Sequence, residues 1–102
     1  MNKRIIPCLY LENGQAVKNF EDRTPLAEPD PERLAAGFGN DGADEVLVFE
    51  FSSGDREHEQ ALEEIKKICA AAEVPVIGAG NVKRMEDVKK LIYAGCRRAV
   101  LN

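Results

Sequence analysis

The sequence predicts an α/β fold, a parallel (βα)4-type half of a TIM barrel, with the order β-α-β-α-β-α-β and a small hairpin after the first strand. Short apolar runs alternate with segments of helical periodicity, as in folds with a parallel sheet. The run at residues 46–49 is apolar on both faces, which indicates a strand covered on both sides. The chain has 102 residues, which we treat as one domain, whereas a complete barrel needs roughly 250.

Four apolar runs are predicted as strands: Arg4–Leu11, Glu45–Phe51, Pro75–Ala79 and Arg98–Leu101. Because right-handed crossovers through helices connect them, we expect these strands to be parallel. After the first run, Asn13-Gly14 predicts a tight turn that pairs the tip of the strand with Ala16–Phe20. The sequence stops directly after the fourth run, so the predicted sheet has open edges and an uncovered part of its core.

Three helices are expected between these strands, at about residues 31–40, 55–72 and 85–94. Asp30 is suited to the N-cap of the first helix, because Pro31 follows it at the first helical position. Gly42 is expected to stop this helix. The second helix carries apolar residues at helical spacing on one face and charges on the rest. We expect that charged face to be solvated and place His58 on it. Gly95 ends the third helix.

Composition excludes several classes of function. The net charge of −4 argues against a nucleic-acid partner or a membrane, because phosphate groups require clustered cations. No apolar run approaches the ~18 residues of a membrane-spanning helix. Cys8, Cys69 and Cys96 are widely spaced, and all three are interpreted as packing residues without a redox role. Cys8 and Cys96 lie in apolar surroundings, as expected of buried thiols in a reducing cytoplasm. With a single histidine there is no Cys/His metal cluster, and we expect no metal and no cofactor.

Motifs along the whole chain carry a family resemblance. In order they are Arg4-Ile5-Ile6-Pro7-Cys8-Leu9-Tyr10, Gly14 with Val17-Lys18, Asp30-Pro31, Gly42-Ala43-Asp44-Glu45, Pro75 to Val82, and Gly95 with Arg98 to Asn102. Their sequence and spacing resemble the cyclase subunit of imidazole glycerol phosphate synthase, a (βα)8-barrel enzyme of histidine biosynthesis. The resemblance covers the amino-terminal half of that barrel.

The resemblance places Tyr10 where the family has its catalytic aspartate, in the pattern K-R-I-I-x-C-L-D. A carboxyl group is readily tuned to transfer protons near neutral pH, whereas a phenol has a pKa near 10. The family's second catalytic aspartate belongs to the other half of the barrel. We therefore expect no cyclase activity from this chain. Lys18 matches a functional lysine of the family, but a solvated lysine on a hairpin is an equal interpretation.

A phosphate site is the second expectation. After an apolar strand, Gly78-Ala79-Gly80-Asn81 lets backbone N–H groups approach an anion next to a helix start. In the resembling family the loop after the third barrel strand and the Asn that ends the fourth bind a substrate phosphate, which carries over to Gly80, Asn81 and Asn102. The opposing interpretation is that these glycines serve only a tight turn. Glu50 lies near the end of the second predicted strand. A carboxylate there could act as a base, but no partner acid is nearby, so Glu50 is expected to be a capping or ion-pairing group.

Charges at three strand starts form the third expected site. Arg4, Glu45 and Arg98 match residues that form a ring of salt bridges at the amino-terminal end of the family's barrel, through which ammonia passes from a glutaminase partner. Residues on this face of a barrel usually serve stability.

The leading hypothesis is a catalytically degenerate half-barrel that self-associates, most simply as a two-fold dimer, and binds a phosphate or sugar-phosphate ligand. Two alternatives stay open. One is half of a split cyclase, a lyase that needs a complementary half-barrel. The other is a purely structural building block without a ligand.

Overall fold

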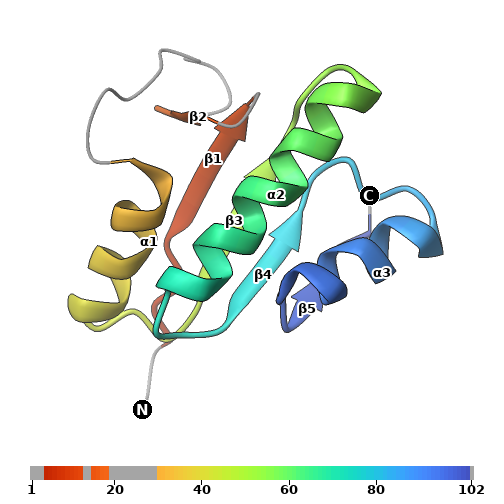
Figure 1. Cartoon of the computed structure of the whole chain (residues 1–102). Helices are drawn as coiled ribbons and strands as arrows, with labels where there is room; N and C mark the ends of the chain where they lie inside the picture. Colours follow the sequence, from red (N-terminus) through yellow and green to blue (C-terminus); the bar gives the residue numbers. More distant parts are fainter. Residues whose placement is uncertain (1–3, 13–14, 19–29, 102) are drawn as a thin grey trace.

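A computed structural model of the chain describes residues 4–12, 15–18 and 30–101. The elements follow the chain as β1 (Cys8–Glu12), β2 (Gln15–Val17), α1 (Pro31–Asn40), β3 (Val46–Glu50), α2 (Asp55–Ala71), β4 (Val76–Ala79), α3 (Met85–Ala94) and β5 (Arg98–Ala99). Figure 1 shows the three helices in front of the sheet. Among the described residues, no helix combines the length and the apolar character needed to cross a membrane.

The sheet has the strand order β2-β1-β3-β4-β5. β1 pairs in parallel with β3, β3 with β4, and β4 with β5, which confirms the predicted parallel α/β arrangement. β2 is the exception, since it pairs antiparallel with β1 and places Tyr10 opposite Val17. The predicted hairpin is therefore present, with its second strand at Gln15–Val17 instead of Ala16–Phe20. Its turn residues Asn13-Gly14, and the end of the predicted strand from residue 19 on, lie outside the described residues.

Helix boundaries agree with the sequence because the capping residues are effective. The Asp30 side chain accepts a hydrogen bond from the Arg33 backbone N–H at 2.9 Å, and Pro31 begins α1. Gly95 ends α3 in the left-handed region at φ 114°, where a glycine is least strained. α2 ends at Ala71, one residue earlier than predicted.

All four predicted strands are longer than the observed ones, the first and the last by the most, while β3 is shorter by one residue at each end and β4 by one residue at its start. β1 begins at Cys8 and not at Arg4, because Pro7 has no N–H to donate to a ladder. The segment before it still runs beside β3, with the Ile5 carbonyl accepting from the Asp44 N–H and the Pro7 carbonyl from the Leu47 N–H. β5 contains only Arg98–Ala99, although the sequence predicts a strand to Leu101. One more bond follows it, from the Val100 N–H to the Gly78 carbonyl.

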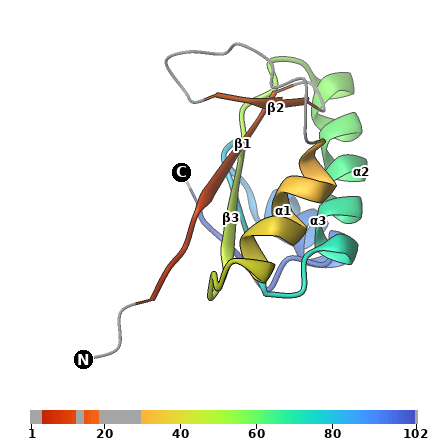
Figure 2. The same cartoon turned by 90° about the vertical axis from the view of Figure 1, so that its left-hand side faces the viewer.

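All three helices pack on one face of the sheet, and Figure 2 shows the other face without a covering helix. The core lies between the helices and the strands, where alternate residues such as Leu9, Val48 and Ile65 are at most 1% exposed. The register pairs Leu9 with Val48, so the neighbouring pair Tyr10 and Phe49 lies on the opposite face. We call this opposite side the open face. Its half-buried side chains include Cys8, Tyr10, Leu47 and Phe49.

Between α1 and α2, the side chain of Glu64 forms a hydrogen bond with that of Glu32. Burial, followed by this contact, raises the pKa of Glu64 from 4.5 to about 7. Between these two values the folded chain binds a proton that the unfolded chain has released. The free energy of unfolding therefore falls as the pH rises through this window, and the contribution of protonated Glu64 is complete only below it.

We expect Glu64→Gln to flatten this decline, because an amide stays neutral at every pH of the window. Urea unfolding at about pH 5 and about pH 8 measures the change in each variant. Glu63→Gln, at the exposed neighbouring position, is the matched control and should keep the slope of the unaltered chain. Equal slopes for the two variants would contradict the expectation.

Candidate functional site

A polar pocket lies at the carboxyl ends of β3 and β4, where parallel sheets usually hold their sites. Its volume is about 260 Å³. The loop after β3 and the first turn of α2 form one wall, and the loop between β4 and α3 forms the other. The lining residues are Ser52, Ser53, Gly54, Asp55, His58, Asn81, Lys83, Arg84 and Asp87. We refer to this cavity as the edge pocket.

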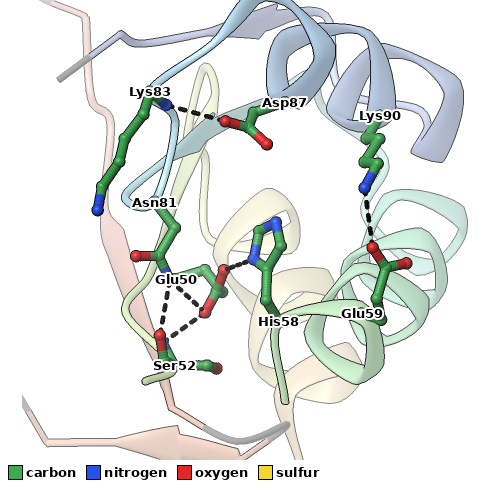
Figure 3. A network of polar contacts seen from close by, with 8 residues as sticks. All are labelled: Glu50, Ser52, His58, Glu59, Asn81, Lys83, Asp87 and Lys90. Carbon is green, nitrogen blue, oxygen red and sulfur yellow. Dashed lines mark hydrogen bonds and ion pairs between the residues drawn. The ribbon is translucent and has the colours of Figure 1, made fainter. Parts of the chain in front are cut away.

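Glu50 contacts three of the residues that line the edge pocket. It is the last residue of β3 and is 1% exposed. One carboxylate oxygen accepts the Ser52 backbone N–H at 2.5 Å and the Asn81 amide at 3.0 Å. The other oxygen lies 2.5 Å from Nδ1 of His58, as Figure 3 shows. Glu50 makes the paired contact expected of it, with His58, but it caps no helix in the described part of the chain, since α2 begins after Gly54 without a side-chain cap bond.

His58 corrects the sequence interpretation. Its side chain is only 19% exposed and lies against Glu50, so its placement on a solvated face was wrong. An ionised carboxylate can only accept, so this contact favours the form of His58 that carries a proton on Nδ1. Figure 3 shows the ring between the carboxylates of Glu50 and Asp87. The single histidine of the chain therefore has a fixed orientation at the wall of the edge pocket.

Asp87 forms the far wall. It is 6% exposed and accepts the backbone N–H groups of Lys83 at 3.1 Å and Arg84 at 3.0 Å, which caps the start of α3. The bond from the Lys83 N–H is the main cause that lowers the pKa of Asp87 below its usual value. On the outer side, Lys90 of α3 pairs with Glu59 of α2 at 2.9 Å. These contacts hold the two helix starts together around the pocket.

Gly80 and Asn81 join the two walls through their backbone conformations, both left-handed with φ of 80° and 51°. A Cβ atom on Gly80 would lie 2.0 Å from the Glu50 carbonyl oxygen, so only glycine fits there. The Asn81 amide donates to Glu50 and, at 2.9 Å, to the Ser52 carbonyl. Both donors of that amide are used within the protein, so any ligand contact of Asn81 has to use its other polar groups. Asn102 lies outside the described residues.

The arrangement pairs an imidazole with a buried carboxylate that fixes its tautomer, which is the geometry of an oriented base. Within the described part of the chain, no three His, Cys, Asp or Glu side chains are placed to hold a metal ion. His58 was missed in the sequence although a signal existed. It lies three residues before Ala61, on the same helical stripe as the buried Ile65 and Ile68.

Glu50→Gln is expected to lower the free energy of unfolding by about 1–3 kcal/mol. Donors from Ser52, His58 and Asn81 all point at the carboxylate, and an amide would turn one of its own N–H groups toward them. Urea unfolding followed by circular dichroism measures the loss. Glu59→Gln, which changes an exposed ion pair, is the control and should stay within about 0.5 kcal/mol. Equal stabilities of the two variants would refute this role of Glu50.

The remaining predicted site residues lie elsewhere. Tyr10 is on the open face, with its ring centroid 6.3 Å from that of Phe49. A hydrogen bond with Cys8 raises the pKa of Tyr10 above its usual value, which takes it further from proton transfer at neutral pH. Lys18 is exposed directly after β2. Neither residue lines the edge pocket.

At the opposite end of the strands, Glu45 is 2% exposed and lies between two arginines. Its Oε2 accepts from Nη2 of Arg98 at 2.6 Å, and its Oε1 pairs with Arg4. The structure thus brings together the three charges expected at the strand starts. Both arginine side chains are more than half exposed, so the buried carboxylate is paired from the solvent side.

Comparison with known proteins gives relatives along the whole chain. The HisF subunit of imidazole glycerol phosphate synthase from Halalkalibacterium halodurans is 30% identical over 102 residues, which are 100% of this chain and 40% of that protein. The same subunit from Nitrosopumilus maritimus is 28% identical over 102 residues, which are 100% of this chain and 38% of that protein. In Campylobacter concisus it is 28% identical over 98% of this chain and 40% of that protein.

The chain therefore spans about two fifths of the length of the curated relatives it matches. A sheet of four parallel strands with helices on one face is consistent with half of a (βα)8 barrel. The family model described as "Histidine biosynthesis protein" matches residues 4–102. These findings confirm the resemblance seen in the sequence, and the chain belongs to the histidine biosynthesis protein family.

Proposed function

We propose that this chain is a catalytically degenerate half-barrel that pairs with a second copy of itself through its open face and binds a phosphate-bearing ligand at the loop after β4. The observation that carries the proposal is the sidedness of the sheet. All three helices lie on one face, and the described residues place no element over the other (Figure 2). In a barrel that second face is the interior and is covered by the remaining strands.

Apolar groups on the open face support self-association. The rings of Tyr10 and Phe49 lie next to each other, and Phe51 follows with its centroid 6.1 Å from that of Phe49. Near the sheet margins, Ile5 is 59% exposed and Val100 is 49% exposed. Exposed apolar surface of this kind marks an interaction site. A two-fold axis is the simplest symmetry that covers one such face with its own copy.

Loss of the reaction rests on Tyr10. A phenol whose pKa is raised further by Cys8 does not hold or deliver a proton at neutral pH in the way a carboxyl group does. A second copy would contribute another Tyr10 and no carboxylate at that position.

Light scattering coupled to size-exclusion chromatography tests the assembly. We expect a mass of twice the 11.3 kDa of the chain at micromolar concentration. A well-folded monomer of 11.3 kDa would overturn the proposal. Activity is assayed separately with ammonia and the ribonucleotide substrate of the family's cyclase. Turnover by the chain alone would refute the proposed loss of cyclase activity.

The phosphate site is supported by the backbone around Gly80 and Asn81. Two successive left-handed residues precede the start of α3, and such loops present N–H groups to anions. Calorimetric titration with inorganic phosphate, and then with a sugar phosphate, tests it. Saturable binding that is lost in Asn102→Ala is the expected result. Absence of binding to the assembled protein would favour a purely structural building block.

Half of a split cyclase is the second candidate function. It is favoured by the coverage of only about two fifths of each curated relative and by the Arg4–Glu45–Arg98 cluster at the strand starts. Mixing with a complementary half-barrel that carries an aspartate decides between the candidates. Turnover of the ribonucleotide with ammonia by the mixture supports the split enzyme, and inactivity of a stable mixed complex excludes it.

A further inference from the structure

Two cysteine side chains from separate elements meet on the helix-covered side of the sheet. Cys69 lies in the last turns of α2, and Cys96 directly follows the residue that ends α3. Their sulfur atoms are 3.9 Å apart, although the residues are 27 positions apart in the sequence. Both are free thiols. The sequence offered no signal for this contact, because the spacing of the cysteines follows no motif.

The backbone holds the two thiols at this distance. Gly95, in its left-handed conformation, turns the chain directly onto α2, and a Cβ atom on it would lie 2.9 Å from the Cβ of Cys69. The Cys96 N–H donates to the Leu91 carbonyl at 3.0 Å, which fixes the residue after the turn. The third cysteine, Cys8, lies on β1 and faces the opposite side of the sheet.

The two sulfur atoms have different environments. Cys69 is partly exposed, whereas Cys96 is 4% exposed. The hydrogen bond between the two thiols lowers the pKa of Cys69 below its usual value. The same contact raises the pKa of Cys96. Cys69 is thus the more accessible and the more readily ionised sulfur, which is what an attacking thiol requires.

From this geometry we propose that Cys69 and Cys96 form an oxidation site, in which a peroxide converts the two thiols into an intramolecular disulfide. The Cys69 thiolate attacks one peroxide oxygen, which forms a sulfenic acid and releases hydroxide. The Cys96 sulfur then attacks the sulfur of Cys69 and displaces its oxygen as water. In balance, two thiols and one hydrogen peroxide give one disulfide and two waters.

The bond requires only a local adjustment. The sulfur atoms have to approach from 3.9 Å to about 2.05 Å. Cys69 is close to the end of α2 and Cys96 lies in the turn after α3, so the approach would combine side-chain rotation with a shift of that turn. The product ties the last turns of α2 to the segment that leads into β5, the edge strand of the sheet.

Peptide mapping of the folded protein after treatment with one equivalent of hydrogen peroxide tests the site. We expect a mass loss of two hydrogen atoms and a cross-linked peptide that contains Cys69 and Cys96, with Cys8 still free to alkylating reagents. Cys8→Ser should oxidise as the unaltered chain does. In Cys96→Ser, where the second step is blocked, dimedone should trap a sulfenic acid on Cys69.

Oxidation in urea provides the contrast. In the unfolded chain, the free energy of closing a loop between two cysteines depends only weakly on the number of residues between them. Disulfides that involve Cys8 should therefore compete with the Cys69–Cys96 disulfide. A Cys69–Cys96 link that dominates in the folded chain and loses its dominance in urea supports the site. The proposal would be overturned if Cys8 of the folded chain formed a disulfide, or if Cys69 accumulated sulfinic acid without any cross-link. The peptide map uses the unaltered chain, so the test does not depend on the folding of a variant.

Discussion

Phe49→Glu is expected to turn the proposed dimer into a monomer. Phe49 lies in the middle strand of the open face, with Tyr10 on one side and Phe51 following it. A second copy that covers this face would bury the new carboxylate in a largely apolar interface. Aromatic residues at the centre of an interface usually contribute most of its binding energy. We expect the dissociation constant to rise by about tenfold at least.

Sedimentation equilibrium of the purified variant measures this constant. Tyr93→Glu is the matched control, since Tyr93 is 85% exposed on α3, away from the open face, and should leave the dimer intact. The far-ultraviolet circular dichroism of both variants shows whether the fold persists. A folded Phe49→Glu variant with an unchanged dissociation constant would rule out the open face as the interface.

Gly80→Ala should cost about 3 kcal/mol or more of the free energy of unfolding. The added methyl group would meet the Glu50 carbonyl oxygen, which belongs to the backbone and cannot rotate away. The residue would also have to keep a φ of 80°, which is strained for alanine. A domain of this size has a total stability of roughly 5–15 kcal/mol. The substitution should therefore remove between about a fifth and more than half of that stability.

Gly37→Ala is the control for this prediction. Gly37 lies inside α1, and a Cβ atom there would meet nothing within 4 Å. Alanine should stabilise the helix by about 0.5–1 kcal/mol. Chemical unfolding of both variants in the same buffer gives the two values with opposite signs. Similar effects of the two substitutions would show that the close approach at Gly80 does not matter.

The helices were predictable from the sequence because their ends are determined locally. Asp30, Pro31 and Gly95 each satisfy or terminate a helix without help from distant residues. The parallel order of the strands followed from the alternation of elements. The lengths of β1 and β5 did not, because they depend on which backbone groups find a partner strand. Pro7 removes one donor at the start of β1, and β5 has a partner on one side only.

The candidate site was predictable only in part. The expected capping by Glu50 is not found, but its paired role could be inferred from its place at the end of an apolar strand. Its three donors could not, because they come from a loop, a helix and the next βα connection. The meeting of Cys69 with Cys96 has the same origin, since only the packing of α3 against α2 brings the two together.

The close approach of Gly80 to Glu50 also bears on how this lineage can change over time. A substitution at position 80 is selected against through misfolding, whether or not any ligand still binds. Drift after the proposed loss of the reaction would therefore replace side chains such as the family's acid, at whose position this chain has Tyr10, while the glycine persists. In descendants of this protein, a glycine-rich signature after β4 would record the demands of folding. Its persistence would not be evidence that a ligand still binds at the site.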